Sequence, residues 1–136
     1  LTPALRACFG QKPVAAFRGR HDRMLVFDRE AQIKDIRPDF AAINKIPARG
    51  VIVTAPGRNA DFVSRFFAPQ SGIAEDPVTG SAHTTLAPYW GKVLGKSEMT
   101  ALQLSPRGGR LWCRVRGNRT VILGKAVTYL RGEIEV

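Results

Sequence analysis

The chain has 136 residues, 44% hydrophobic and 24% charged, which is enough for residues 1–136 to form a single domain with its own core. Twenty-one lysines and arginines against eleven aspartates and glutamates give a formal net charge of +10, which favours anionic partners without indicating a fold. This composition excludes a largely disordered chain, and no run of about 18 apolar residues is present to span a membrane.

The first residues lack the basic segment followed by an apolar segment that is typical of a secretory signal peptide. They also lack an initiator methionine, as a trimmed or partial chain would. Cys8 and Cys113 are far apart and match no metal-binding or redox spacing, and two histidines add little to a ligand set. We therefore expect buried thiols in a reducing cytoplasm and no bound metal.

Apolar runs bounded by turn residues predict four strands in the first half of the chain. Residues 14–17 and 24–27 predict two strands joined by a polar turn, and residues 50–54 and 61–68 predict two more. Between these pairs, Pro38 occupies the first turn of a predicted short helix, a position that suits its fixed backbone.

The second half begins with a predicted loop over residues 69–79 and a helix over 81–94. Gly95 stands where a glycine commonly ends a helix, and Pro88 is expected to kink or break the helix. Four further strands are predicted at residues 100–105, 111–115, 120–123 and 126–130. Strands, one well-marked helix and more strands predict an α+β fold with a mostly antiparallel sheet.

Arginines gather between residues 107 and 119, around the predicted strand 111–115. Because side chains alternate along a strand, Arg114 shares a face with Trp112, whereas Leu111 and Cys113 lie on the opposite face. A basic face with one aromatic side chain could bind nucleic acid, or it could be the solvated face of a sheet. The sequence leaves both interpretations open.

Residues that could bind a ligand or transfer a proton lie together where the predicted loop over residues 69–79 meets the predicted helix. Pro77 holds Asp76 in an extended conformation, and Gly80 allows close approach to the backbone. The free amides of residues 80–82 would then form a nest for a carboxylate or phosphate, with Asp76 beside it as an acceptor of protons or hydrogen bonds. On spacing alone, Asp76 and Ser81 could instead simply cap the helix.

Two neighbouring side chains also have open roles at this stage. His83 lies in the first helical turn, where the imidazole could face a cleft or pack inside the domain. Arg65, on the preceding strand, could steady Asp76 or an anionic substrate, or it could lie at the surface.

A long motif resembles the signature of the phenazine-biosynthesis PhzF family of isomerases. The motif consists of Ser64-Arg65-Phe66-Phe67-Ala68-Pro69 and Gly72-Ile73-Ala74-Glu75-Asp76-Pro77-Val78-Thr79-Gly80-Ser81-Ala82-His83. The resemblance extends over essentially the whole chain, including the Ser105-Pro106-Arg107-Gly108-Gly109 turn. It implies the diaminopimelate-epimerase-like fold, in which each of two lobes is a curved, mostly antiparallel mixed sheet wrapped around a central helix. This chain resembles only the second, C-terminal lobe.

The resemblance also implies roles for individual residues. Asp76 matches the acidic residue of the site, and Gly80 and Ser81 match positions that bind substrate. Thr79 stands where related epimerases and racemases carry a catalytic cysteine, and we expect it to bind substrate. His83 is a secondary candidate for substrate binding. The family's principal general acid/base is a glutamate of the first lobe, helped by a Gly-His segment there, and neither is found in this sequence.

The function implied is a cofactor-independent isomerase that moves a proton within a small carboxylate-bearing metabolite. Because the first-lobe glutamate is absent, we expect this chain alone to be inactive, and we expect its partner to be a missing N-terminal lobe or a second copy. The alternative, favoured by the net charge of +10, is a basic module that binds nucleic acid or another anionic partner.

Overall fold

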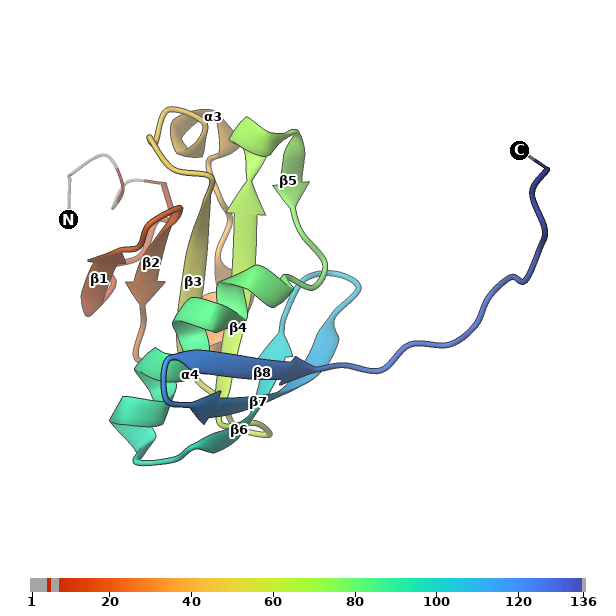
Figure 1. Cartoon of the computed structure of the whole chain (residues 1–136). Coiled ribbons are helices and arrows are strands. Elements are labelled where there is room, and N and C mark those ends of the chain that lie inside the picture. Colours follow the sequence, from red (N-terminus) through yellow and green to blue (C-terminus); the bar gives the residue numbers. More distant parts are fainter. Residues whose placement is uncertain (1–4, 6–7, 136) are drawn as a thin grey trace.

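The computed structural model describes residue 5 and residues 8–135, and within them eight strands form one sheet (Figure 1). The strands are β1 (Ala15–Arg18), β2 (Asp22–Val26), β3 (Gly50–Pro56), β4 (Phe62–Ala68), β5 (Ile73–Glu75), β6 (Glu98–Gln103), β7 (Gly109–Arg116) and β8 (Arg119–Leu123). The helices are α2 (Glu30–Asp35), α3 (Phe40–Ile43), the short 3₁₀ helix η1 (Pro69–Ser71) and α4 (Gly80–Leu94).

The sheet is mixed and mostly antiparallel, as predicted. Its strand order is β1-β2-β3-β4-β6-β7-β8, and β5 pairs with β4. Within the described residues, β2 is parallel to β3 and β4 is parallel to β6, whereas the other pairs are antiparallel. The α+β class is therefore confirmed.

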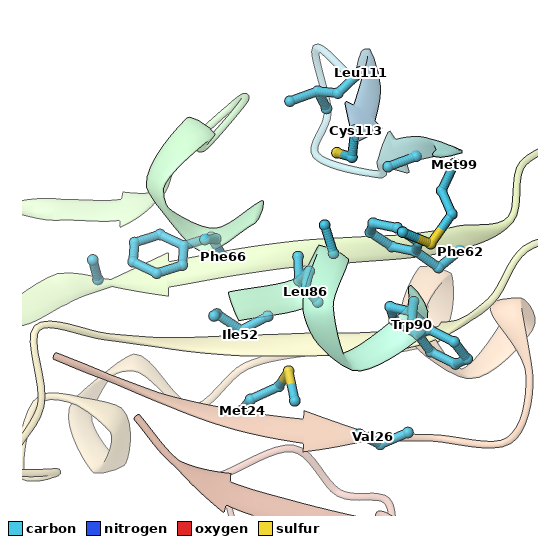
Figure 2. Close-up of a cluster of buried hydrophobic side chains, with 14 residues drawn as sticks. Met24, Val26, Ile52, Phe62, Phe66, Leu86, Trp90, Met99, Leu111 and Cys113 are labelled. Atoms are coloured by element: carbon cyan, nitrogen blue, oxygen red, sulfur yellow. The ribbon is translucent and has the colours of Figure 1, made fainter. Parts of the chain in front are cut away.

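Helix α4 covers one face of the sheet, and its buried side chains form a core with residues from five strands (Figure 2). Figure 2 shows Leu86 and Trp90 of α4 among side chains of the strands. The Trp90 ring stacks on Phe62 with centroids 5.9 Å apart, and its Nε1 donates to Thr54 Oγ1 at 2.9 Å. The buried indole therefore keeps a hydrogen-bond partner, as a buried polar group requires.

A second core lies on the other face of the sheet, beneath α2 and α3. It includes Ile33 and Ile43 from these helices and Val63 and Phe67 from β4. Side chains of β4 point alternately to the two faces of the sheet and therefore contribute to both cores, and each residue of β4 is buried. A strand buried on both faces is a central element of a two-layered core.

The helix boundaries differ in part from the prediction. Gly95 does end α4 in the left-handed conformation, with φ of +66°, but α4 continues unbroken through Pro88. Pro88 has no N–H to donate to the Thr84 carbonyl, four residues earlier in the helix. Because Pro88 and Thr84 are exposed, this carbonyl can accept a hydrogen bond from water instead. Pro38 is not in the first turn of α3, because Asp39 caps that helix by accepting from Ala42 N at 2.9 Å.

Other differences concern elements without a strong local signal. Helix α2 was not predicted, and the predicted loop over residues 69–79 contains η1 and β5. The prediction of a strand at residues 126–130 is wrong. In the described structure this segment pairs with no other strand and runs away from the sheet (Figure 1). Its side chains are open to solvent, with Tyr129 97% exposed. None of the described helices is long and apolar enough to cross a membrane.

Candidate active site

The candidate site lies where the carboxyl ends of β5 and β6 meet beside β4. Strand β5 runs antiparallel to β4 and pairs at Phe67, whereas β6 runs parallel to β4 and ends with Gln103 opposite Ser64. The two strands therefore approach one another end to end along the same edge of β4. The chain after β5 fills the gap between them, and Asp76 N donates to Phe66 O at 3.0 Å.

Asp76 is half-buried at the start of this turn. Its Oδ2 accepts a hydrogen bond from the Thr79 hydroxyl at 2.6 Å. Thr79 is the N-cap residue of α4, but its side chain makes no bond to the first helical turn. The turn therefore brings Asp76 and the start of α4 together, as the motif predicts, and the Thr79 hydroxyl is directed to the carboxylate.

Gln103 was missed in the sequence and is the main support of this turn. Its Oε1 accepts from Thr79 N at 2.8 Å, and its Nε2 donates to Asp76 O at 2.7 Å and to Thr79 Oγ1 at 3.0 Å. A signal was present, because alternation in β6 puts Gln103 on the same buried face as Met99 and Ala101. A glutamine on an apolar face needs buried partners.

Ser105, two residues further on, holds the same turn. Its hydroxyl donates to Pro77 O at 2.7 Å and accepts from Gly108 N at 3.1 Å. Gly109 packs against Val78 so closely that a Cβ there would lie 2.2 Å from Val78 Cγ2. The connection between β6 and β7 therefore fixes the turn at several points.

The first turn of α4 is open to solvent at Gly80 and Ser81. The Thr79 side chain at the N-cap makes no hydrogen bond to the amides of this turn, and among the described residues nothing beyond the local backbone lies within 4 Å of a Cβ added at Gly80. Uncapped amides at a helix start carry the positive end of the helix dipole and favour an anion. The geometry suits a carboxylate or phosphate beside Asp76.

His83 lies inside the domain rather than at the open surface. It is fully buried, its ring is 5.9 Å from Phe62 between centroids, and its Nδ1 donates to Thr79 O at 2.8 Å. Nε2 has no partner in the described part of the chain. Burial lowers the pKa of His83, and the bond to Thr79 opposes this only in part. The imidazole is therefore neutral, and its hydrogen bond to Thr79 O stabilises the N-cap of α4.

The neutral state of His83 predicts a loss of stability in acid. In the unfolded chain His83 binds a proton near pH 6.5, whereas in the folded chain His83 binds it only at lower pH, because its pKa is lowered. The free energy of unfolding should therefore decrease as the pH falls below about 6.5, at up to about 1.4 kcal/mol per pH unit. Urea unfolding between pH 7 and 5 tests this. His83→Gln should remove the slope, and an equal slope in that variant would contradict the assignment.

Arg65 contacts Glu75 rather than Asp76. Its Nε and Nη2 donate to the two carboxylate oxygens of Glu75 at 2.7 and 2.8 Å, and Nη1 donates to the carbonyls of Ile33 and Ile36. Arg65 is 8% exposed, so it is a buried residue rather than a surface one. Of the two adjacent carboxylates, Glu75 is therefore held in an ion pair with Arg65, whereas Asp76 accepts from the Thr79 hydroxyl.

Neither cysteine lies at the start of α4. Cys8 and Cys113 are both buried thiols, and burial raises the pKa of Cys113 to about 11. Among the described residues, no group of three or more His, Cys, Asp or Glu side chains is arranged to hold a metal ion.

A groove of about 800 Å³ lies beside the turn, with Val78 as part of its wall. Its basic lining comes from Arg107, Arg110 and Lys125, and Lys125 Nζ lies 5.8 Å from the Trp112 ring centroid. In strand β7, Leu111 and Cys113 are buried, whereas Trp112 and Arg114 are partly exposed, so the predicted faces are confirmed.

Comparison with known proteins identifies the relatives of this chain. A family model described as phenazine biosynthesis-like protein (PhzC-PhzF) matches residues 4–132. An uncharacterized isomerase of Pseudomonas aeruginosa is 51% identical over 136 residues, covering 99% of this chain and 52% of that protein. A phenazine biosynthesis-like domain-containing protein of Mus musculus is 50% identical over 93 residues, covering 63% of this chain and 32% of that protein.

Solved structures agree with the sequence matches. A PhzF-family crystal structure from Enterococcus faecalis has a TM-score of 0.93 and 45% identity, covering all of this chain and 52% of that one. A putative PhzC/PhzF protein from Clostridium difficile has a TM-score of 0.90 and 40% identity, with the same coverage. The fold expected from the motif is confirmed. The chain spans about half the length of these bacterial relatives.

Proposed function

This chain belongs to the phenazine biosynthesis-like (PhzC-PhzF) family, and from this premise we propose that it forms one lobe of an isomerase. The substrate is a small metabolite that bears a carboxylate. The observation that carries the proposal is the open, uncapped start of α4 at Gly80 and Ser81, directly beside the Asp76 carboxylate. The amides of Gly80 and Ser81 bind the anion, and the Asp76 carboxylate accepts a hydrogen bond or a proton.

In the proposed reaction, a proton leaves a carbon next to an unsaturated or carboxylated group and returns to another carbon of the same molecule. The substrate carboxylate lies on the amides of Gly80 and Ser81, which hold its charge most strongly when the cleft excludes water. Asp76 orients the substrate or relays the proton. Thr79 and His83 support this arrangement from within the lobe.

The principal acid/base group lies outside this chain in the proposal, on a partner lobe of different sequence. Two features support a partner. The curated relatives are about twice as long, and the segment after β8 exposes Val127, Tyr129, Leu130 and Ile134. Large exposed apolar side chains of this kind mark interaction surfaces.

The first experiment is the intact mass of the native gene product. A product about twice this length, with a glutamate and a Gly-His segment upstream, supports the proposal. That protein, incubated in D₂O with carboxylated metabolites, should then incorporate deuterium into one of them. A native product no longer than this chain would contradict catalysis by this route.

A basic binding module is the second candidate, favoured by the groove that Arg107, Arg110, Lys125 and Trp112 line. Binding to a polynucleotide should then weaken steeply with added salt, because counterions compete for the phosphates. No binding at about 0.05 M salt, where phosphate contacts are strong, would exclude this candidate.

A further inference from the structure

Gln103 uses both polar atoms of its amide group on the turn that carries Asp76. The residue is 1% exposed, and its bonds to Asp76 O, Thr79 N and Thr79 Oγ1 are 2.7 to 3.0 Å long. The reversed amide would place its NH₂ group against the Thr79 N–H, so that two donors would face each other. The partners therefore allow only one orientation of the Gln103 side chain.

This orientation gives the hydrogen bonds of the turn a direction. Because Gln103 Nε2 donates to Thr79 Oγ1, the Thr79 hydroxyl proton is free to point at Asp76 Oδ2, 2.6 Å away. In the described part of the chain, no other group bonds to the Asp76 side chain. The direction of the carboxylate therefore depends on Thr79, and that of Thr79 depends on Gln103.

We propose that Gln103 and Thr79 are positioning residues, which hold Asp76 Oδ2 and leave Oδ1 open to the substrate. This rests on the proposed role of Asp76. Neither residue touches the substrate in this proposal, because both are buried beneath the turn. Gln103 also holds Thr79 N, so the same side chain fixes the start of α4 and aligns the anion site with the carboxylate.

The test compares variants of this chain by NMR. Thr79→Val removes the hydroxyl with little change in shape, and Thr79→Ser keeps it. Gln103→Leu removes all three bonds. Gln70→Leu is the matched control, because Gln70 also donates to a carbonyl, that of Ala48, away from the site. Three-bond couplings report the rotamer of Asp76, and acetate is the probe for the amides of Gly80 and Ser81.

We expect a single Asp76 rotamer in the wild type, Thr79→Ser and Gln70→Leu, and rotamer averaging in Thr79→Val and Gln103→Leu. Acetate binding should weaken about fivefold to tenfold in the last two variants, a change of the size that one hydrogen bond contributes. Thr79→Val removes two bonds of the turn and Gln103→Leu removes three, but in both the amides that bind acetate remain and only their alignment with Asp76 is lost. An unchanged Asp76 rotamer in folded Thr79→Val overturns the inference. If Gln103→Leu does not fold, the Thr79→Val and Thr79→Ser pair decides alone.

The acetate titration separates this inference from the proposed function. If acetate leaves the Gly80 and Ser81 amides of the wild type unperturbed, the proposed anion site fails. The rotamer measurement still decides whether Gln103 and Thr79 position Asp76. If acetate binds the wild type and all variants equally and the rotamer does not change, the anion site stands and the positioning role is refuted.

Discussion

Replacing Arg65 with leucine is expected to lower the free energy of unfolding by about 3–5 kcal/mol. The Arg65 and Glu75 side chains are 10% and 13% exposed and share two parallel hydrogen bonds. Without the guanidinium, the Glu75 carboxylate is left largely buried and unpaired. The carbonyls of Ile33 and Ile36 also lose their donor, so the contact between β4 and α2 weakens.

Urea unfolding of Arg65→Leu and of a matched control measures this loss. Arg114→Leu is the control, because Arg114 pairs with Glu98 in a bridge whose side chains are 42% and 64% exposed. Exposed pairs contribute about 0–1 kcal/mol, so this variant should stay close to the wild type. An equal, small loss in both variants would contradict the structural role of Arg65.

Asp76→Asn is expected to lower kcat of the native-length enzyme by about 10²-fold to 10⁴-fold, the usual contribution of a positioned acid/base group. The amide oxygen of asparagine can still accept from the Thr79 hydroxyl, so the turn should keep its shape. The variant loses the negative charge and the ability to take a proton. The decrease should therefore appear in turnover without a loss of stability.

The rate of deuterium incorporation from D₂O measures this effect once a substrate is found. Asp39→Asn is the matched control, because the Asp39 side chain caps α3 and asparagine caps as well as aspartate. A wild-type rate in Asp76→Asn would show that Asp76 is not needed for proton transfer. The anion site at Gly80 and Ser81 would then be the only part of the proposal to remain.

Local patterns in the sequence predicted the elements that depend on neighbouring residues. The alternation of residues 61–68 predicted β4, and Gly95 predicted the end of α4, because each depends on the geometry of a few consecutive residues. The motif also placed Asp76 next to the start of α4, since both belong to one turn. These features are fixed by spacing along the chain.

Tertiary structure alone decided which groups meet. Gln103 contacts Asp76 and Thr79 because β5 and β6 end against each other on β4, and the register Ser64 to Gln103 cannot be read locally. The pairing of Arg65 with Glu75 depends on the same sheet. These hydrogen bonds form only after the strands are paired.

The segment 126–130 shows that a local pattern can also predict an element that the tertiary structure does not form. Its apolar, β-branched residues predict a strand, but a strand is completed only by hydrogen bonds to a neighbour, and the described sheet offers it none. His83 likewise could face outward or inward by sequence, and packing against Phe62 decided that it lies inside. The sequence determined local conformation and the residues of the motif, whereas partners and burial were decided by contacts between segments far apart in the chain.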